Sequence, residues 1–104
     1  VNLYGRLQVK EIHSQIRTVE AWLRDKPQDP VLLLTMGRLM LRNQQLELAR
    51  EYFQRSLNVH KTLDASMEMS QLLEQLGEHQ RASEYYRLSI GLAGQNQEGE
   101  TSSH

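Results

Sequence analysis

A pair of amphipathic helices that occurs twice in the same register constrains this chain more than any other feature of its sequence. In residues 30–60, apolar or small residues spaced by three and four mark one face of each helix, and a polar turn at 42–45 separates the two helices. These residues are Leu33, Met36, Gly37 and Met40 in the first helix and Ala49, Phe53 and Leu57 in the second. Because the turn is short, we expect an antiparallel hairpin in which Gly37 and Ala49 allow close approach.

The second occurrence lies at residues 63–93. When it is aligned with the first at one constant offset in residue number, similar residues coincide. The matched pairs are Met36 with Met69, Gly37 with Ser70, Leu39 with Leu72, Ala49 with Ala82, Tyr52 with Tyr85, Phe53 with Tyr86 and Leu57 with Ile90. A two-helix repeat of this length is typical of a solenoid, an architecture that presents a concave binding surface. The sequence therefore predicts an all-α helical-hairpin solenoid with about two and a half repeats and five or so helices.

The repeat register divides the chain into one domain, residues 1–93, and a tail. We predict a partial repeat at 1–29, full repeats at 30–62 and 63–93, and a disordered tail at 94–104, where no apolar residue offers an anchor. Within the partial repeat, a first helix is expected at 1–9 and a second at 11–26, with a buried stripe formed by Ile12, Ile16, Val19 and Leu23. Trp22 stands where the later repeats carry serine, so we expect it to cover an end or a gap.

Local signals set the expected ends of the other helices. Asp29 and Pro30 suit the N-cap and first turn of a helix that reaches Arg42. Its partner is expected at 47–60. Thr62 or Asp64 is expected to cap the next helix, which reaches residue 76, and Gly77 turns the chain into a last helix at 80–92.

The first full repeat resembles the tetratricopeptide pattern W-x2-L-G-x2-Y…A-x3-F. The matching positions are Leu33, Met36, Gly37, Met40, Ala49 and Phe53, with Leu33 in place of tryptophan and Met40 in place of tyrosine. The second copy departs further, because Ser66 and Ser70 occupy first-helix positions. The resemblance implies a tetratricopeptide-like fold that binds protein or peptide partners.

A narrower resemblance, chiefly within residues 1–60, points to the C-terminal region of HemY. It rests on Tyr4-Gly5-Arg6-Leu7, Glu20-Ala21-Trp22-Leu23, Pro27-Gln28-Asp29-Pro30, the run from Leu32 to Leu39, Leu41-Arg42-Asn43 and residues 72–77. HemY proteins are bacterial, membrane-anchored tetratricopeptide proteins associated with haem biosynthesis. The resemblance implies a soluble piece of a parent at the inner membrane, on its cytoplasmic side, with haem-biosynthesis enzymes as partners.

Composition narrows the class of partner. The net charge is −1, which argues against nucleic-acid binding. Residues 1–55 hold nine Lys/Arg and six Asp/Glu, whereas residues 56–104 hold three and seven, so the halves carry +3 and −4. This asymmetry would favour head-to-tail stacking with a neighbour, although a solvated surface is the simpler explanation and the one we prefer. The longest apolar run, from Val31 to Leu34, is far shorter than the roughly 20 residues of a membrane span.

The residues that carry catalysis or bind metals are missing or scattered. There is no cysteine, no G-x-S-x-G nucleophile motif and no glycine-rich phosphate loop. The serines at 56, 66, 70 and 89 fall at small-residue packing positions, and no two of the four histidines are spaced as metal ligands. We therefore expect no enzyme, no metal site and no cofactor.

The expected binding surface is the concave groove formed by the first helices of the repeats. In tetratricopeptide proteins, positions 2, 5, 9, 12 and 13 of each first helix face this groove. Here they are Val31, Leu34, Arg38, Leu41 and Arg42, followed by Asp64, Met67, Gln71, Glu74 and Gln75. The apolar residues Leu34, Leu41 and Met67, with Arg38 and Arg42 beside them, suit an amphipathic helix or an extended peptide.

Two alternatives stay open at the level of sequence. The resemblance to HemY makes a haem or porphyrin carrier conceivable, with His60 or His79 as axial ligand. The chain could also be a self-association module, in which a second copy fills the groove and forms a homodimer.

Overall fold

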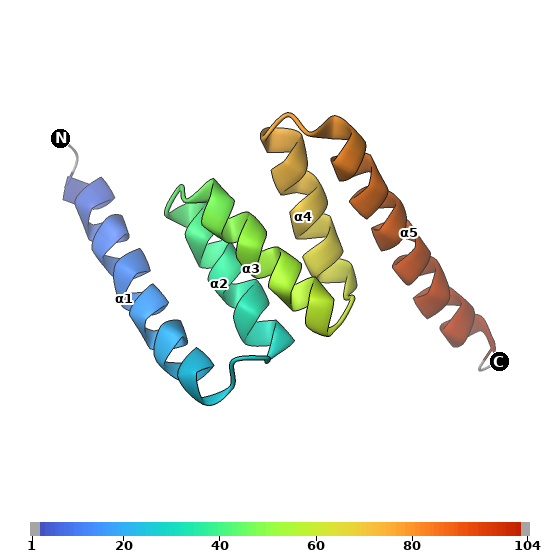
Figure 1. Cartoon of the computed structure of the whole chain (residues 1–104), viewed down its shortest axis with the longest axis horizontal. Helices are drawn as coiled ribbons and strands as arrows, with labels where there is room; N and C mark the ends of the chain where they lie inside the picture. The colour runs from blue at the N-terminus through green and yellow to red at the C-terminus, as the bar shows by residue number, and fades with distance from the viewer. Residues whose placement is uncertain (1–2, 103–104) are drawn as a thin grey trace. The chain divides into compact units, whose positions relative to one another are not determined.

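The described residues form five α-helices, which confirms the predicted all-α class. The structure is a computed structural model that describes the backbone of residues 3–102 and the side chains of residues 9–94. The helices are α1 (Leu3–Asp25), α2 (Pro30–Arg42), α3 (Leu46–Val59), α4 (Leu63–Gln75) and α5 (His79–Ser102) (Figure 1). They divide into two compact units, Val1–Val59 with α1 to α3 and His60–His104 with α4 and α5.

The predicted cap of α2 is confirmed, and α4 has a similar cap at the equivalent position of its repeat. The Asp29 carboxylate accepts hydrogen bonds from the backbone N–H groups of Val31 at 2.9 Å and Leu32 at 3.1 Å, and Pro30 fills the first turn. Of the two candidates for α4, Thr62 is the N-cap, since its hydroxyl accepts from Ala65 N–H at 3.2 Å. Each cap satisfies backbone donors that the first helical turn leaves without partners.

Both hairpin turns use the same backbone geometry. After α2, the N–H groups of Gln44 and Gln45 donate to the Leu41 and Met40 carbonyls. After α4, the N–H groups of residues 77 and 78 donate in the same way to the carbonyls of residues 74 and 73. This pattern is a Schellman motif, which needs one residue in the left-handed region. Gln44 fills that position at φ 60° and Gly77 at φ 83°, so the predicted role of Gly77 in the turn is confirmed.

The matched turns make a paired stability prediction. A left-handed conformation costs a residue with a Cβ atom about 1 kcal/mol more than it costs glycine. We therefore expect Gln44→Gly to raise the free energy of unfolding by about 0.5–1 kcal/mol and Gly77→Gln to lower it by about 1 kcal/mol. Urea denaturation followed by circular dichroism measures both. Changes of the same sign in the two variants would show that φ at this position does not set the stability of the turn.

In the first unit, α2 and α3 lie side by side as a hairpin, and α1 packs on α2 (Figure 1). The Phe53 ring lies against Gly37, so closely that a methyl group on Gly37 would be 2.5 Å from Cδ1 of the ring. Ser56 Oγ donates to the Pro30 carbonyl at 2.8 Å and so ties α3 to the start of α2. The core contains Ile16, Val19, Leu33, Leu34, Met36, Gly37, Leu39, Met40, Ala49, Phe53, Ser56 and Leu57.

These buried residues confirm the predicted stripes of α2 and α3 and the centre of the stripe of α1. The two ends of the α1 stripe, Ile12 and Leu23, are only half-buried, so the prediction of full burial is wrong for them. In this unit α1 packs mainly against α2, whereas α2 packs against both α1 and α3. A helix covered on one side keeps the ends of its apolar stripe partly accessible.

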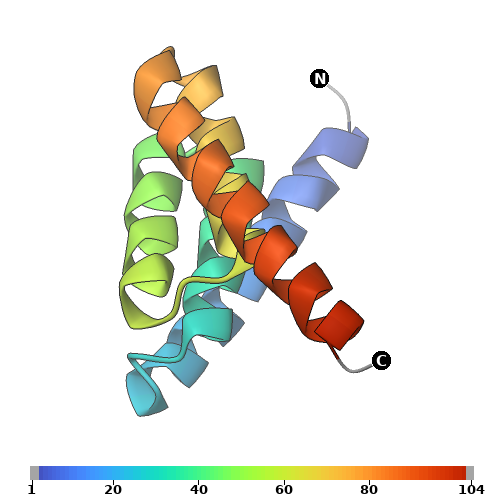
Figure 2. The ribbon, with the colours of Figure 1, turned by 90° about the vertical axis from the view of Figure 1, so that its right-hand side faces the viewer.

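In the second unit, α4 and α5 lie side by side as the other hairpin (Figure 1, Figure 2). Its core combines apolar residues with three serines; it contains Ala65, Ser66, Met69, Ser70, Leu72, Leu73, Ala82 and Ser89. The serines donate to backbone carbonyls: Ser70 to Ala82 at 3.0 Å across the hairpin, Ser66 to Thr62 at 2.9 Å and Ser89 to Tyr86 at 2.6 Å. These bonds make small polar residues acceptable at the packing positions that the sequence predicted for them.

The predicted break between residues 9 and 11 is wrong, because α1 is one helix of 23 residues. We expected two helices, at 1–9 and 11–26, to preserve the repeat register. Nothing in this segment stops a helix, since neither proline nor a turn dipeptide separates Val9 from Glu11. Lysine and glutamate, which occupy residues 10 and 11, are good helix formers.

The predicted disordered tail, residues 94–104, is wrong for residues 94–102, because α5 continues to Ser102. Residues 103–104 lie outside the described residues. The segment offers no apolar anchor, yet it contains no proline, and Gly94 and Gly99 each cost a helix only about 1 kcal/mol. Glutamine and glutamate, which favour helix, fill much of the remainder. The division into repeats stays a prediction.

The two hairpins differ at the aromatic position of their second helices. Phe53 is 0% exposed, whereas its counterpart Tyr86 is 57% exposed and Ile90, the counterpart of Leu57, is 55% exposed. For the aromatic ring, we attribute the difference to the residue opposite it. Where the first hairpin has Gly37, the second has Ser70, whose Cβ atom would occupy the space that the Phe53 ring uses. An aromatic ring at position 86 therefore turns outward.

Candidate interaction surface

Helix α2 presents two different faces, because its residues alternate between a buried stripe and the stripe predicted to bind a partner. Val31 is 68% exposed, Arg38 and Arg42 are exposed, and Leu41 is half-buried. Leu34, which we expected to supply apolar surface, is only 9% exposed, because it lies within the packed side of the helix. The accessible surface of α2 therefore combines Val31 and Leu41 with two guanidinium groups.

Arg42 lies at a hollow of about 380 Å³ between α2 and α1. The other residues around this hollow, Glu11, Ile12 and Gln15, come from α1. Sequence reasoning assigned the binding surface to first helices alone and missed this contribution. A usable signal existed, because Ile12 belongs to the stripe that the sequence predicted for the packed face of its helix.

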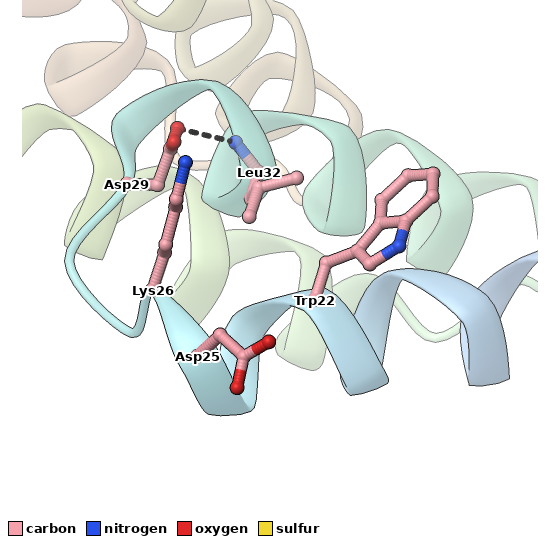
Figure 3. Close-up of a pocket in the computed structure, with 5 residues that line it drawn as sticks. All are labelled: Trp22, Asp25, Lys26, Asp29 and Leu32. Carbon is pink, nitrogen blue, oxygen red and sulfur yellow. Dashed lines mark hydrogen bonds between the residues drawn. The ribbon is translucent and has the colours of Figure 1, made fainter.

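A second hollow, of about 310 Å³, lies where α1 ends and α2 begins (Figure 3). Trp22 projects from α1 toward α2, on the side of Leu32, while Asp25, Lys26 and Asp29 complete the lining (Figure 3). Trp22 is exposed, so it covers this gap only in part. The hollow combines an indole with two carboxylates, one amine and the side chain of Leu32.

The α2–α3 turn carries a third hollow, of about 330 Å³, beside α1. Ile16 and Met40 are buried here and Leu48 is exposed, with His13 and Arg17 on α1 and Asn43 and Gln45 on the turn. None of these residues belongs to the predicted groove set. The sequence places Ile16 and Met40 in the core, and only the fold shows that Leu48 gathers beside them.

In the second unit, the predicted residues are exposed along α4. Met67, Gln71 and Glu74 all face solvent, as do Asp64 and Gln75. Glu74 is also engaged within its own hairpin, because its Oε1 lies 2.6 Å from Nδ1 of His79 across the turn. This pair holds the end of α4 to the start of α5, which the sequence did not suggest.

The groups that could support chemistry are dispersed over the described residues. His13, His60 and His79 are all exposed, and His104 lies outside the described residues. Among the residues whose positions are given, no three of His, Cys, Asp and Glu gather closely enough to hold a metal ion. Within the same part of the chain, no helix is both long and apolar enough to cross a membrane.

Together, the two antiparallel hairpins, with equivalent caps, turns and core positions, define a helical-repeat protein. Comparison with known proteins specifies the repeat: residues 63–96 match the family model described as tetratricopeptide repeat. The match falls on the second copy, whose residue identities depart further from the pattern. No curated protein sequence matches this chain significantly.

A solved structure supports the same class. The structure titled "MamA RS-1 ArsTM double mutant" superposes with a TM-score of 0.80 at 18% sequence identity, over 86% of this chain and 51% of that one. This chain therefore spans about half the length of that protein. Because the sequence identity is low, the match supports a shared fold and nothing about function. The fold class is an all-α, tetratricopeptide-like helical solenoid. Tetratricopeptide repeats generally mediate protein–protein interactions, and this fold is a typical non-catalytic scaffold.

Proposed function

We propose that this chain is a non-catalytic interaction scaffold that binds a helix or an extended peptide on the exposed stripe of α2. The observation that carries the proposal is the combination, on one helix, of exposed Val31 and half-buried Leu41 with exposed Arg38 and Arg42. Apolar anchors with flanking charge recognise an amphipathic segment, because burial supplies affinity and the charges fix orientation. The hollow beside Arg42 offers space for one side chain of such a segment.

The preferred partner is acidic. α2 contains two arginines and no acidic residue, so its exposed stripe is basic. Arginine presents a planar fork that binds carboxylates through two hydrogen bonds, so the partner segment would carry Asp or Glu next to its apolar residues. In the second unit, exposed Met67 and Gln71 offer a separate surface on α4 that lacks this basic character.

A more specific proposal concerns the longer protein of which this chain would be a part. It rests on the resemblance to HemY. Under this proposal the parent is anchored at a bacterial inner membrane, and the domain gathers enzymes of haem biosynthesis. The residues that carry the resemblance include the α1–α2 linker and α2 itself.

An affinity pull-down from solubilised bacterial membranes tests the proposal, with Arg38→Glu/Arg42→Glu as the decisive variant. We expect the unmodified chain to retain a defined set of proteins and the variant to retain at least about tenfold less, because two charges at the surface reverse sign. Lys10→Glu/Arg24→Glu is the matched control, since it makes the same charge change on exposed residues of α1 that line none of the three hollows. Circular dichroism must show equal helicity in all three chains.

The identities and the controls decide the outcome. Retention that survives in Arg38→Glu/Arg42→Glu would place the binding surface elsewhere and overturn the proposal. Equal loss in both variants would indicate a general charge effect and would also overturn it. If the retained proteins include no enzyme of haem biosynthesis, the scaffold function stands but the proposed link to haem biosynthesis is refuted.

A further inference from the structure

The hollow at the α2–α3 turn is lined by one apolar side chain from each helix of the first unit. Ile16 of α1 and Met40 of α2 are buried there, whereas Leu48 of α3 is 42% exposed. A ligand side chain placed against Leu48 would remove apolar surface from water, which favours binding. The volume of about 330 Å³ lies at the lower end of the range for ligand sites, so it suits a short segment rather than a whole helix.

The ionisable residues that line this hollow are all basic. They are Arg17 and His13, which are spaced i, i+4 and so share one face of α1; the imidazole is positive when it is protonated. The other two hollows of the unit each contain carboxylates, from Glu11 in one and from Asp25 and Asp29 in the other. A lining with charge of one sign favours a ligand of the opposite sign. The complementary group is a carboxylate, which the planar fork of arginine binds through two hydrogen bonds.

The α2–α3 turn adds two side-chain amides, from Asn43 and Gln45. Among the residues that the structure describes, neither these amides nor the Arg17 guanidinium has a hydrogen bond or an ion pair. Each amide offers an NH₂ donor and a carbonyl acceptor. A peptide group offers one N–H and one C=O, so the amides can satisfy both of its polar groups, whereas a phosphate oxygen could use only their donors.

We infer that this hollow binds a short, extended, acidic peptide segment of a partner protein. A large apolar side chain of the segment lies against Leu48, a carboxylate two residues away binds Arg17, and the two amides of the turn hydrogen-bond to the backbone of the segment. Side chains two residues apart lie on the same side of an extended chain, so one segment can make both contacts. None of the lining residues belongs to the exposed stripe of α2, so this site is separate from the surface of the proposed function.

Titration of the full chain with a capped peptide, Gly-Glu-Ser-Leu-Ser-Glu-Gly, followed by backbone amide NMR, tests the inference. We expect saturable shifts in the amide signals of the residues around the hollow. Two further peptides separate the contributions of charge and burial. Replacing both glutamates with lysine, or the leucine with serine, should weaken binding at least about threefold.

Variants of the chain locate the site. Arg17→Glu should weaken binding about three- to tenfold, because the ion pair is replaced by repulsion, and Leu48→Ser should weaken it at least about threefold. Both residues are exposed, so we expect both variants to fold, and circular dichroism checks this. Arg24→Glu is the matched control, since it makes the same charge change about two turns further along α1, outside the hollow, and should leave the affinity unchanged.

Three results would overturn the inference. They are the absence of saturable shifts, equal binding of the lysine peptide, and equal weakening by Arg17→Glu and Arg24→Glu. Arg38→Glu/Arg42→Glu should bind the peptide with unchanged affinity, because it changes only the stripe of α2. Loss of binding in that variant alone would move the peptide to the surface of the proposed function and would also overturn this inference. The pull-down tests the proposed function independently, because its decisive variant leaves this hollow intact.

Discussion

Replacing Phe53 with alanine is expected to lower the free energy of unfolding by about 3–5 kcal/mol, the range for a large aromatic side chain removed from a core. Phe53 is fully buried and its ring lies on Gly37, where no side chain can move in to fill the space. The loss therefore includes both the transfer of the ring to water and the cavity that remains. Denaturant unfolding monitored by circular dichroism measures the change.

The chain supplies its own control for this prediction. Tyr86 occupies the same position of the next hairpin but is largely exposed, so Tyr86→Ala should cost no more than about 1 kcal/mol. Equal losses at the two positions would mean that Tyr86 is buried in solution. Both variants are measured at low protein concentration.

Replacing Gly37 with alanine is expected to lower the free energy of unfolding by about 1–3 kcal/mol, although alanine favours helix over glycine by about 1 kcal/mol. The added methyl group would lie 2.5 Å from Cδ1 of Phe53 and closer still to Cε1. The ring cannot move aside without displacing α3 from α2, because both helices are packed along their length. Overpacking therefore outweighs helix propensity.

A double-mutant cycle separates these two effects. In the Phe53→Ala background the ring is gone, so Gly37→Ala should become neutral or stabilising, and the coupling between the positions should exceed about 1 kcal/mol. Gly91→Ala is the matched control, because a methyl group on Gly91 in α5 meets no atom within 4 Å. It should raise the free energy of unfolding by about 0.5–1 kcal/mol. Additive losses at positions 37 and 53 would refute steric contact as the cause.

The helix boundaries show how far local reasoning reaches. The start of α2 was predictable because Asp29 and Pro30 are both local signals, and an N-cap needs only the backbone groups of the next turn. The turn at Gly77 was equally predictable, because glycine commonly follows the end of a helix. The errors, in α1 and in α5 beyond residue 92, arose where the expected repeat pattern was given more weight than uninterrupted helix-forming sequence.

The candidate surface was predictable only in part. The repeat register identified which residues share a face of α2, because that depends on helical periodicity alone. It did not reveal that Leu34 is nearly buried, that α1 adds Ile12 and Gln15 to the hollow at Arg42, or that Leu48 lies beside the buried end of α2. Each of these facts depends on which helix packs against which.

Local sequence was enough to predict the caps of α2 and α4, the turn at Gly77 and the apolar stripes of α2 and α3, since these follow from interactions between residues a few positions apart. Which of the matched positions are covered depends on how the helices pack. Phe53 and Tyr86 have the same place in the pattern, yet one is core and the other surface. Burial depends on the atoms opposite a side chain, here the absent Cβ of Gly37 against the present Cβ of Ser70, and that difference becomes decisive only when two helices meet.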